Sequence, residues 1–233
     1  MKGFFKFILI KLPLALIVLS VLNVLILKWV PVWVTPIMVK RAIEYRHDPD
    51  FRTTREWCRL EDISPEMKKA VIASEDNLFC KHHGFDRKAI EQAIQERKDG
   101  KRIRGGSTIS QQTAKNVFTL HKRNMWRKAV ESYYTVLIEW IWGKERIMEV
   151  YLNVIETGKG VYGVQAAADK YFGKDAAALT RREAAAIAVC LPSPLKRDPA
   201  HPTDYIRSRT SAISSLIPKI SYPEWVENKQ VKE

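Results

Sequence analysis

The chain has 233 residues, with 39 Lys and Arg against 26 Asp and Glu, so its formal net charge is +13. Ten glycines and 11 prolines are too few for a collagen-like or low-complexity protein, and a mean hydropathy of −0.24 excludes a protein with many membrane spans. What remains is a basic globular domain large enough for one hydrophobic core, with at most one membrane anchor.

An apolar segment lies near the N-terminus. Residues 12–27 carry no charge and form a run about 24 Å long as a helix. Lys11 and Lys28 can snorkel, which together with Trp29 and Val30 extends the run to about the 30 Å of a bilayer core. A cleavable signal peptide is the alternative, but no small-x-small cleavage site follows. We therefore predict an uncleaved single-pass anchor, preceded by a short stub, within residues 1–39.

The sequence after residue 39 predicts a series of helices. Ser64-Pro65 begins one that runs towards Asn77, and Asp86 caps a second. Ser107 ends a Gly-Gly loop and is the expected N-cap of the next helix. Periodicity and a capping box at Thr180 predict further helices over 108–118, 130–141, 144–155, 181–191 and 204–216. Without a series of alternating strands, the chain reads as one mainly α domain over residues 40–217, with a tail over 218–233.

Two acids close the first of these helices. Glu75 and Asp76 stand at the negative end of the helix dipole, a position that tends to raise the pKa of a carboxylate. A raised pKa suits a general base near neutral pH. The alternative is a solvated helix end, the usual explanation for an isolated Glu-Asp pair.

Polar side chains crowd the helix that follows the Gly-Gly loop. Its N-terminus offers free N–H groups to an anion. Gln111, Gln112, Lys115 and Asn116 then occupy about one and a half turns. Capping explains the loop and Ser107, but it does not explain the four polar residues after it.

A group of cations comes next. Arg123, Arg127 and Lys128 precede Glu131, which is spaced to pair with Arg127 on a helix. A surface ion pair worth less than about 1 kcal/mol is the ordinary explanation, and a clamp for a pyrophosphate is the other. Residues 144–153 form a fourth cluster, which by itself is a plain amphipathic helix.

Some features suggest chemistry that the rest of the sequence does not support. Residues 158–163 match G-x-G-x-x-G but lack the βαβ units of a dinucleotide fold. Residues 193–196 match S-x-x-K without a K-T-G partner. The three widely spaced cysteines, Cys58, Cys80 and Cys190, predict neither a disulfide framework nor a zinc site.

Taken in order, the clusters resemble the peptidoglycan glycosyltransferase family, the module that also forms the N-terminal half of bifunctional penicillin-binding proteins. E-D-x-x-F-x-x-H-x-G matches residues 75–84, and G-G-S-T-I-x-Q-Q with K-N matches 105–116. R-K-x-x-E matches 127–131, Y-L-N matches 151–153, and G-x-x-G-x-x-A-A…Y-F-G-K matches 160–174. The likeness covers about residues 53–202, and without acyl-transferase motifs we expect the monofunctional form.

The resemblance implies a lysozyme-like helical fold of two lobes, one partly dipped in the membrane. It implies a lipid II polymerase that extends glycan strands by β-1,4 transfer with inversion and releases undecaprenyl pyrophosphate, in cell-wall biogenesis and the maintenance of cell shape. The N-terminus would be cytoplasmic and the domain periplasmic, at a bacterial inner membrane. Expected partners are lipid II, the glycan strand, the membrane and other cell-wall synthesis proteins, but no nucleic acid.

The resemblance also assigns roles to residues. Glu75 is the expected base, and Glu131 a second catalytic residue that organises the cations or holds a divalent metal, Mg or Mn. No organic cofactor is expected. The expected substrate-binding residues are Asp76, Ser107, Gln111, Gln112, Lys115, Asn116, Arg123, Arg127 and Lys128.

Two other classes of protein remain as alternatives. A lysozyme-like enzyme that cleaves murein needs one Glu acid and no cation cluster, so the cations weigh against it. A membrane-anchored basic module would bind anionic lipid or nucleic acid through exposed Lys and Arg, in a salt-sensitive way that survives Glu75→Gln.

Overall fold

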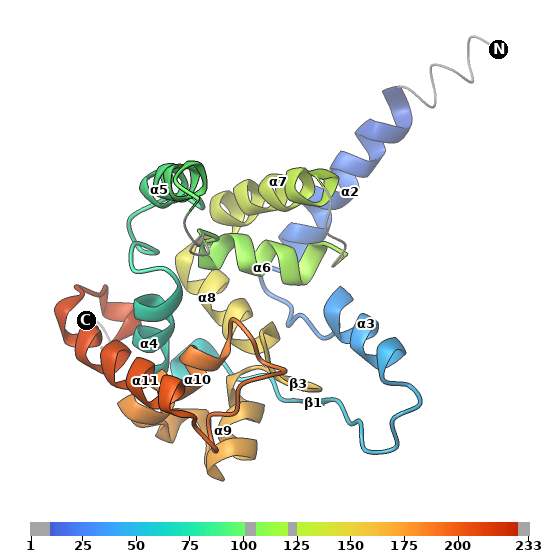
Figure 1. Ribbon diagram of the computed structural model, residues 1–233. Coiled ribbons are helices and arrows are strands. Elements are labelled where there is room, and N and C mark those ends of the chain that lie inside the picture. The colour runs from blue at the N-terminus through green and yellow to red at the C-terminus, as the bar shows by residue number, and fades with distance from the viewer. Residues whose placement is uncertain (1–9, 101–105, 121–124, 228–233) are drawn as a thin grey trace, which may run out of the picture.

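The computed structural model describes residues 10–100, 106–120 and 125–227 (Figure 1). Within these ranges the chain is mainly helical, which confirms the predicted fold class at that level. The helices form two groups. They meet where Glu75, at the end of a helix in the first group, contacts Gln112 on a helix of the second.

The apolar N-terminal segment forms α2 (Leu12–Ile26), which projects from the body of the protein (Figure 1). Val24 is buried, and its carbonyl accepts the indole N–H of Trp142 over 2.7 Å. The hydroxyls of Ser20 and Tyr133 are also 2.7 Å apart, so the last turns of α2 are fixed to the domain. Among the residues that the structure describes, no helix is both long enough and apolar enough to cross a membrane.

The first group consists of α4 (Pro65–Glu75), α10 (Arg181–Cys190) and α11 (Asp204–Leu216). Ser64 caps α4 as predicted, with its hydroxyl oxygen 3.3 Å from the Glu66 nitrogen. Buried alanines along α10 let α4 pack closely against it. The predicted tail packs here as η4 (Ile217–Lys219) and η5 (Glu224–Val226), where the fully buried Lys68 donates to the Trp225 carbonyl over 3.1 Å.

The second group consists of α5 (Arg87–Lys98), α6 (Ile109–Phe118), α7 (Met125–Ile141) and α8 (Gly143–Val154). The predicted cap of α6 was wrong, because Thr108 and not Ser107 occupies that position. Thr108 Oγ1 accepts from the Gln111 nitrogen, and Gln111 Oε1 accepts from the Thr108 nitrogen, each over 3.1 Å. This reciprocal pair needs Glu or Gln three residues after the cap, and Ser107 has Ser110 there.

A short sheet and the remaining helices complete the fold. β1 (Thr54–Arg55) runs parallel to β3 (Val161–Tyr162), which is antiparallel to β2 (Glu156–Gly158). The other elements are α3 (Pro36–Glu44), α9 (Val164–Phe172), η2 (Leu60–Asp62) and η3 (Ala176–Ala178). The G-x-G-x-x-G glycines serve this sheet: Gly160 has φ +73°, and a Cβ there would lie 2.2 Å from the Arg52 carbonyl oxygen.

The three cysteines are free. Burial raises the pKa of Cys58 and Cys80 to about 11 and that of Cys190 to about 12. All three thiols are therefore protonated at neutral pH and are weak nucleophiles.

Candidate active site

Glu75 is the last residue of α4, and its carboxylate is half-buried against α6. The side-chain amide of Gln112 donates to Glu75 Oε2 over 3.0 Å, and the Ser74 hydroxyl lies 3.4 Å from Oε1. Burial raises the pKa of Glu75, while these hydrogen bonds and the positive charges of Lys115 and Arg197 oppose the shift. A carboxyl group with a raised pKa beside polar partners is suited to proton transfer near neutral pH.

Asp76 follows directly but is buried and fully engaged with the protein. Its Oδ2 accepts from the nitrogen of Ile109, the first residue of α6, over 3.0 Å. His82 Nε2 lies 2.9 Å from Oδ1 and 3.0 Å from Oδ2. Asp76 thus joins the end of α4, the loop that carries His82 and the start of α6, where the helix dipole favours a negative charge. These contacts suit a positioning role for Asp76, which the sequence suggests beside its place among the substrate-binding residues; contact with substrate stays a prediction.

A pocket of about 280 Å³ opens beside Glu75. Its walls come from the end of α4, the start of α5 and the loop before α6; its polar lining residues are Ser74, Glu75, Asp76, Asn77, Asp86, Ser107 and Thr108. Ser107 is exposed on this wall. Carboxylates, hydroxyls and an amide around one small space suit the hydroxyl groups of a sugar.

Gln112 is oriented by a residue on α8. The fully buried Tyr151 donates its hydroxyl to Gln112 Oε1 over 3.3 Å, which leaves the Gln112 amide N–H to face Glu75. Asn153, in the same Y-L-N motif, exchanges hydrogen bonds of 2.8 Å with the nitrogen and carbonyl of Cys58 and is structural. Tyr151 and His82 are not among the site residues predicted from the sequence, although their place in the matched motifs is a signal that could find them.

The cations gather around a buried acid. Glu131 on α7 is 2% exposed, and its Oε2 lies 2.5 Å from Arg127 while Lys128 contacts Oε1. Glu131 is therefore not part of an ordinary exposed ion pair, which was the alternative interpretation of its spacing from Arg127. The pKa of Lys115 on α6 is lowered, chiefly by burial and also by the positive charge of Arg127. The negative charges of Glu131 and Glu75 oppose this shift. Lys115 thus stands in the fields of both the candidate base and the cation group.

Two further predicted residues, Gln111 and Asn116, lie on α6. Gln111 is buried, and its Oε1 is used by the cap of α6. Asn116 is buried on the same helix. Arg123 lies outside the described residues, so the structure does not place it.

The residues present do not fit a metal site built by the protein alone. No group of three or more His, Cys, Asp and Glu side chains in the described part of the chain is placed to hold a metal ion. Both carboxylate oxygens of Glu131, the predicted ligand, are already paired with cations. A divalent cation therefore stays a prediction, and no catalytic step is derived through it.

Known proteins resemble this chain over most of its length. A family model described as Transglycosylase matches residues 43–217. A biosynthetic peptidoglycan transglycosylase of Caulobacter vibrioides is 48% identical over 206 residues, 88% of this chain and 88% of the relative. Proteins of the same name from Bacteroides thetaiotaomicron and Pseudomonas entomophila are 47% and 45% identical, over 91% and 89% of this chain and 86% and 88% of their own lengths.

Proposed function

This chain belongs to the transglycosylase family and is a peptidoglycan glycosyltransferase, and from that premise we propose that it polymerises lipid II into glycan strands. The reaction joins a sugar 4-hydroxyl to the anomeric carbon of a lipid-linked sugar in β-1,4 linkage with inversion, and releases undecaprenyl pyrophosphate. One observation carries the proposal: α6 bears both Gln112, which contacts Glu75, and Lys115, which faces the cation group.

Glu75 is the proposed base. The acceptor hydroxyl is a weak nucleophile, and the pocket beside Glu75 is lined by polar groups that can bind its sugar. As the hydroxyl oxygen bonds to the anomeric carbon, its proton passes to Glu75 and the electron pair of the breaking C–O bond goes to the pyrophosphate. Burial raises the pKa of Glu75 and makes it a stronger proton acceptor than an exposed glutamate.

The pyrophosphate needs neutralisation of its charge more than it needs a proton, because it is already a weak base. Lys115, Arg127 and Lys128 are the proposed source of that positive charge. Glu131 binds the last two through separate oxygens, so it organises the cations and is poorly placed to act as a second acid. Fixed cations in a partly buried site stabilise developing negative charge without reorganisation.

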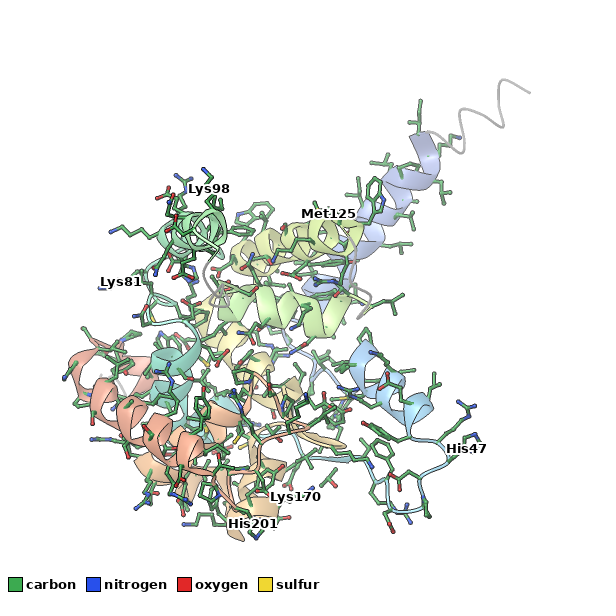
Figure 2. All side chains as sticks on the ribbon, in the orientation of Figure 1. His47, Lys81, Lys98, Met125, Lys170 and His201 are labelled. Atoms are coloured by element: carbon green, nitrogen blue, oxygen red, sulfur yellow. The ribbon has the colours of Figure 1, made fainter. Side chains whose placement is uncertain are left out.

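We also propose that α2, with the residues before it, anchors the enzyme in a bacterial inner membrane, with the N-terminus in the cytoplasm and the domain in the periplasm. Most apolar side chains of α2 are exposed. Met125 begins α7 beside α2 (Figure 2), and Trp126 and Trp140 on α7 are more than 80% exposed. Such apolar surface suits contact with lipid, and the two groups of helices then form the two lobes of a lysozyme-like fold.

The test compares synthesis with cleavage. Purified full-length protein in detergent is incubated with lipid II and, separately, with finished murein, and the products are separated by size. We expect glycan polymer from lipid II and no soluble fragments from murein. Muropeptides released from murein, with no polymer from lipid II, would establish the lysozyme-like alternative instead.

A further inference from the structure

An ion pair that the proposed mechanism does not use lies among α6, α7 and α8, which pack on one another (Figure 1). Glu139 on α7 and Lys144 on α8 approach to 2.6 Å, and their side chains are 8% and 19% exposed. The hydroxyl of Ser110, a fully buried residue of α6, donates to the same carboxylate oxygen, Oε1. A single carboxylate therefore joins three helices.

The ion pair also contacts the loop that follows α4. Lys144 Nζ lies 4.5 Å from the centre of the buried Phe79 ring, and a cation is attracted to an aromatic face. Phe79 in turn donates its N–H to the Asp76 carbonyl over 3.0 Å. At the end of the loop, a Cβ at Gly84 would lie only 3.1 Å from Cγ of Glu139. The loop is thus packed against both members of the pair.

The pair provides a fixed geometry more than stability. Loss of hydration offsets most of the attraction between two buried charges. Glu139 contacts Ser110, which lies about 200° around α6 from Gln112, so it restrains the helix from the side opposite the amide that contacts Glu75. Because side chains extend about 5–6 Å from a helix axis, a rotation of about 10° would move that amide by about 1 Å.

We propose that Glu139 is a positioning residue that fixes the rotation of α6 and so keeps the Gln112 amide on Glu75. Lys144 holds the carboxylate of Glu139 in place, and Ser110 is the point where that carboxylate holds α6. The proposal rests on the proposed function, in which Glu75 is the base. A displacement of about 1 Å in a catalytic site can lower the rate about 10²-fold, so loss of the restraint should appear in kcat.

The first test removes the contact and keeps the ion pair. Ser110→Ala deletes the hydroxyl that reaches Glu139, and we expect kcat for lipid II polymerisation to fall about tenfold with little change in KM. Thr113→Val is the matched control, because the equally buried Thr113 hydroxyl bonds the Ile109 carbonyl within α6. It should keep the wild-type kcat. Equal kcat values for Ser110→Ala and wild type would overturn the proposal.

The pH dependence separates positioning from a loss of stability. The hydrogen bond from Gln112 lowers the pKa of Glu75, so displacement of the amide should raise that pKa and move the acid limb of kcat to higher pH. Glu139→Gln should show this shift. Glu156→Gln breaks another partly buried ion pair, with Arg41 over 2.9 Å between α3 and β2, and should not show it. An acid limb that moves equally in both variants, or in neither, would overturn the proposal.

A double variant shows whether the effect passes through Gln112. Gln112→Leu already lacks the amide, so adding Ser110→Ala should lower kcat no further, whereas a second loss of the same size would overturn the proposal. Thermal unfolding checks that each variant is folded, and if Glu139→Gln is not, the acid limb is measured with Ser110→Ala. A wild-type protein inactive on lipid II would contradict the proposed function and this proposal with it; an active wild type with an unaffected Ser110→Ala would contradict this proposal alone.

Discussion

Glu75 and Asp76 are adjacent in the chain, yet the fold gives them different tasks. Glu75 keeps one side towards the pocket and is held by a neutral amide from Gln112. Both carboxylate oxygens of Asp76 contact His82, and one of them also accepts a hydrogen bond from the first N–H of α6. A base must change its protonation state during turnover, whereas a positioning residue must not, and the two environments match these requirements.

The raised pKa of Glu75 predicts a stability effect. The folded protein binds this proton more tightly than the unfolded chain does, so ionised Glu75 destabilises the fold, and the penalty is relieved as the pH falls through its folded pKa. Glu75→Gln should therefore raise the free energy of unfolding at pH 7, and the gain should vanish below the ordinary pKa of glutamate. Urea unfolding across pH measures this, with Glu91→Gln, at an exposed site on α5, as the control. Equal stability of Glu75→Gln and wild type at pH 7 would contradict the effect of burial.

Asp76→Asn tests the positioning role. Asn keeps the size of the side chain but loses one acceptor oxygen, so either Ile109 or His82 loses its partner. We expect a fall in kcat with little change in KM and a loss of about 1–3 kcal/mol of unfolding free energy. Steady-state kinetics and thermal unfolding measure the two effects. A large rise in KM with unchanged kcat would instead show that Asp76 binds substrate.

At the level of elements, α6 connects the parts of the site. It begins at the Asp76 contact, carries Gln112 and Lys115, and packs on α7, which carries Glu131. A small rotation or shift of α6 therefore changes the base and the cations together.

Two capping boxes offer a matched pair of variants. Thr108→Ala removes the cap of α6, and Thr180→Ala removes the equivalent cap of α10. Each should cost about 1 kcal/mol of unfolding free energy. Only Thr108→Ala should also lower kcat, because the Thr108 hydroxyl holds the Gly84 carbonyl at 2.7 Å beside the site. Similar kcat values for the two variants would show that the start of α6 does not position the base.

Much of the helix pattern could be predicted because its signals are local. Ser64 and Thr180 bond to atoms within three residues, so the sequence alone locates those helix starts. The contact of Asp76 with the start of α6 could not be predicted this way, because its partner Ile109 is 33 residues away. The burial of Glu131 likewise depends on the packing of α6 against α7.

At the scale of the whole molecule, the projecting α2 and the apolar faces near it set the orientation that we propose at a membrane. Deletion of residues 1–22 should sharply reduce sedimentation with phospholipid vesicles and leave the domain folded, since the buried Val24 and its contact with Trp142 are retained. Vesicle sedimentation and thermal unfolding check both parts. Undiminished binding by the folded truncated protein would contradict the anchor.

The most direct test of the central claim is the rate of lipid II polymerisation by Glu75→Gln beside wild type and Glu91→Gln, all full-length and shown to be folded. Removal of a general base should lower kcat by about 10²- to 10⁴-fold, and the exposed control should keep the wild-type rate. A Glu75→Gln protein that polymerises lipid II within a few-fold of wild type would contradict the assignment of the base and the mechanism built on it.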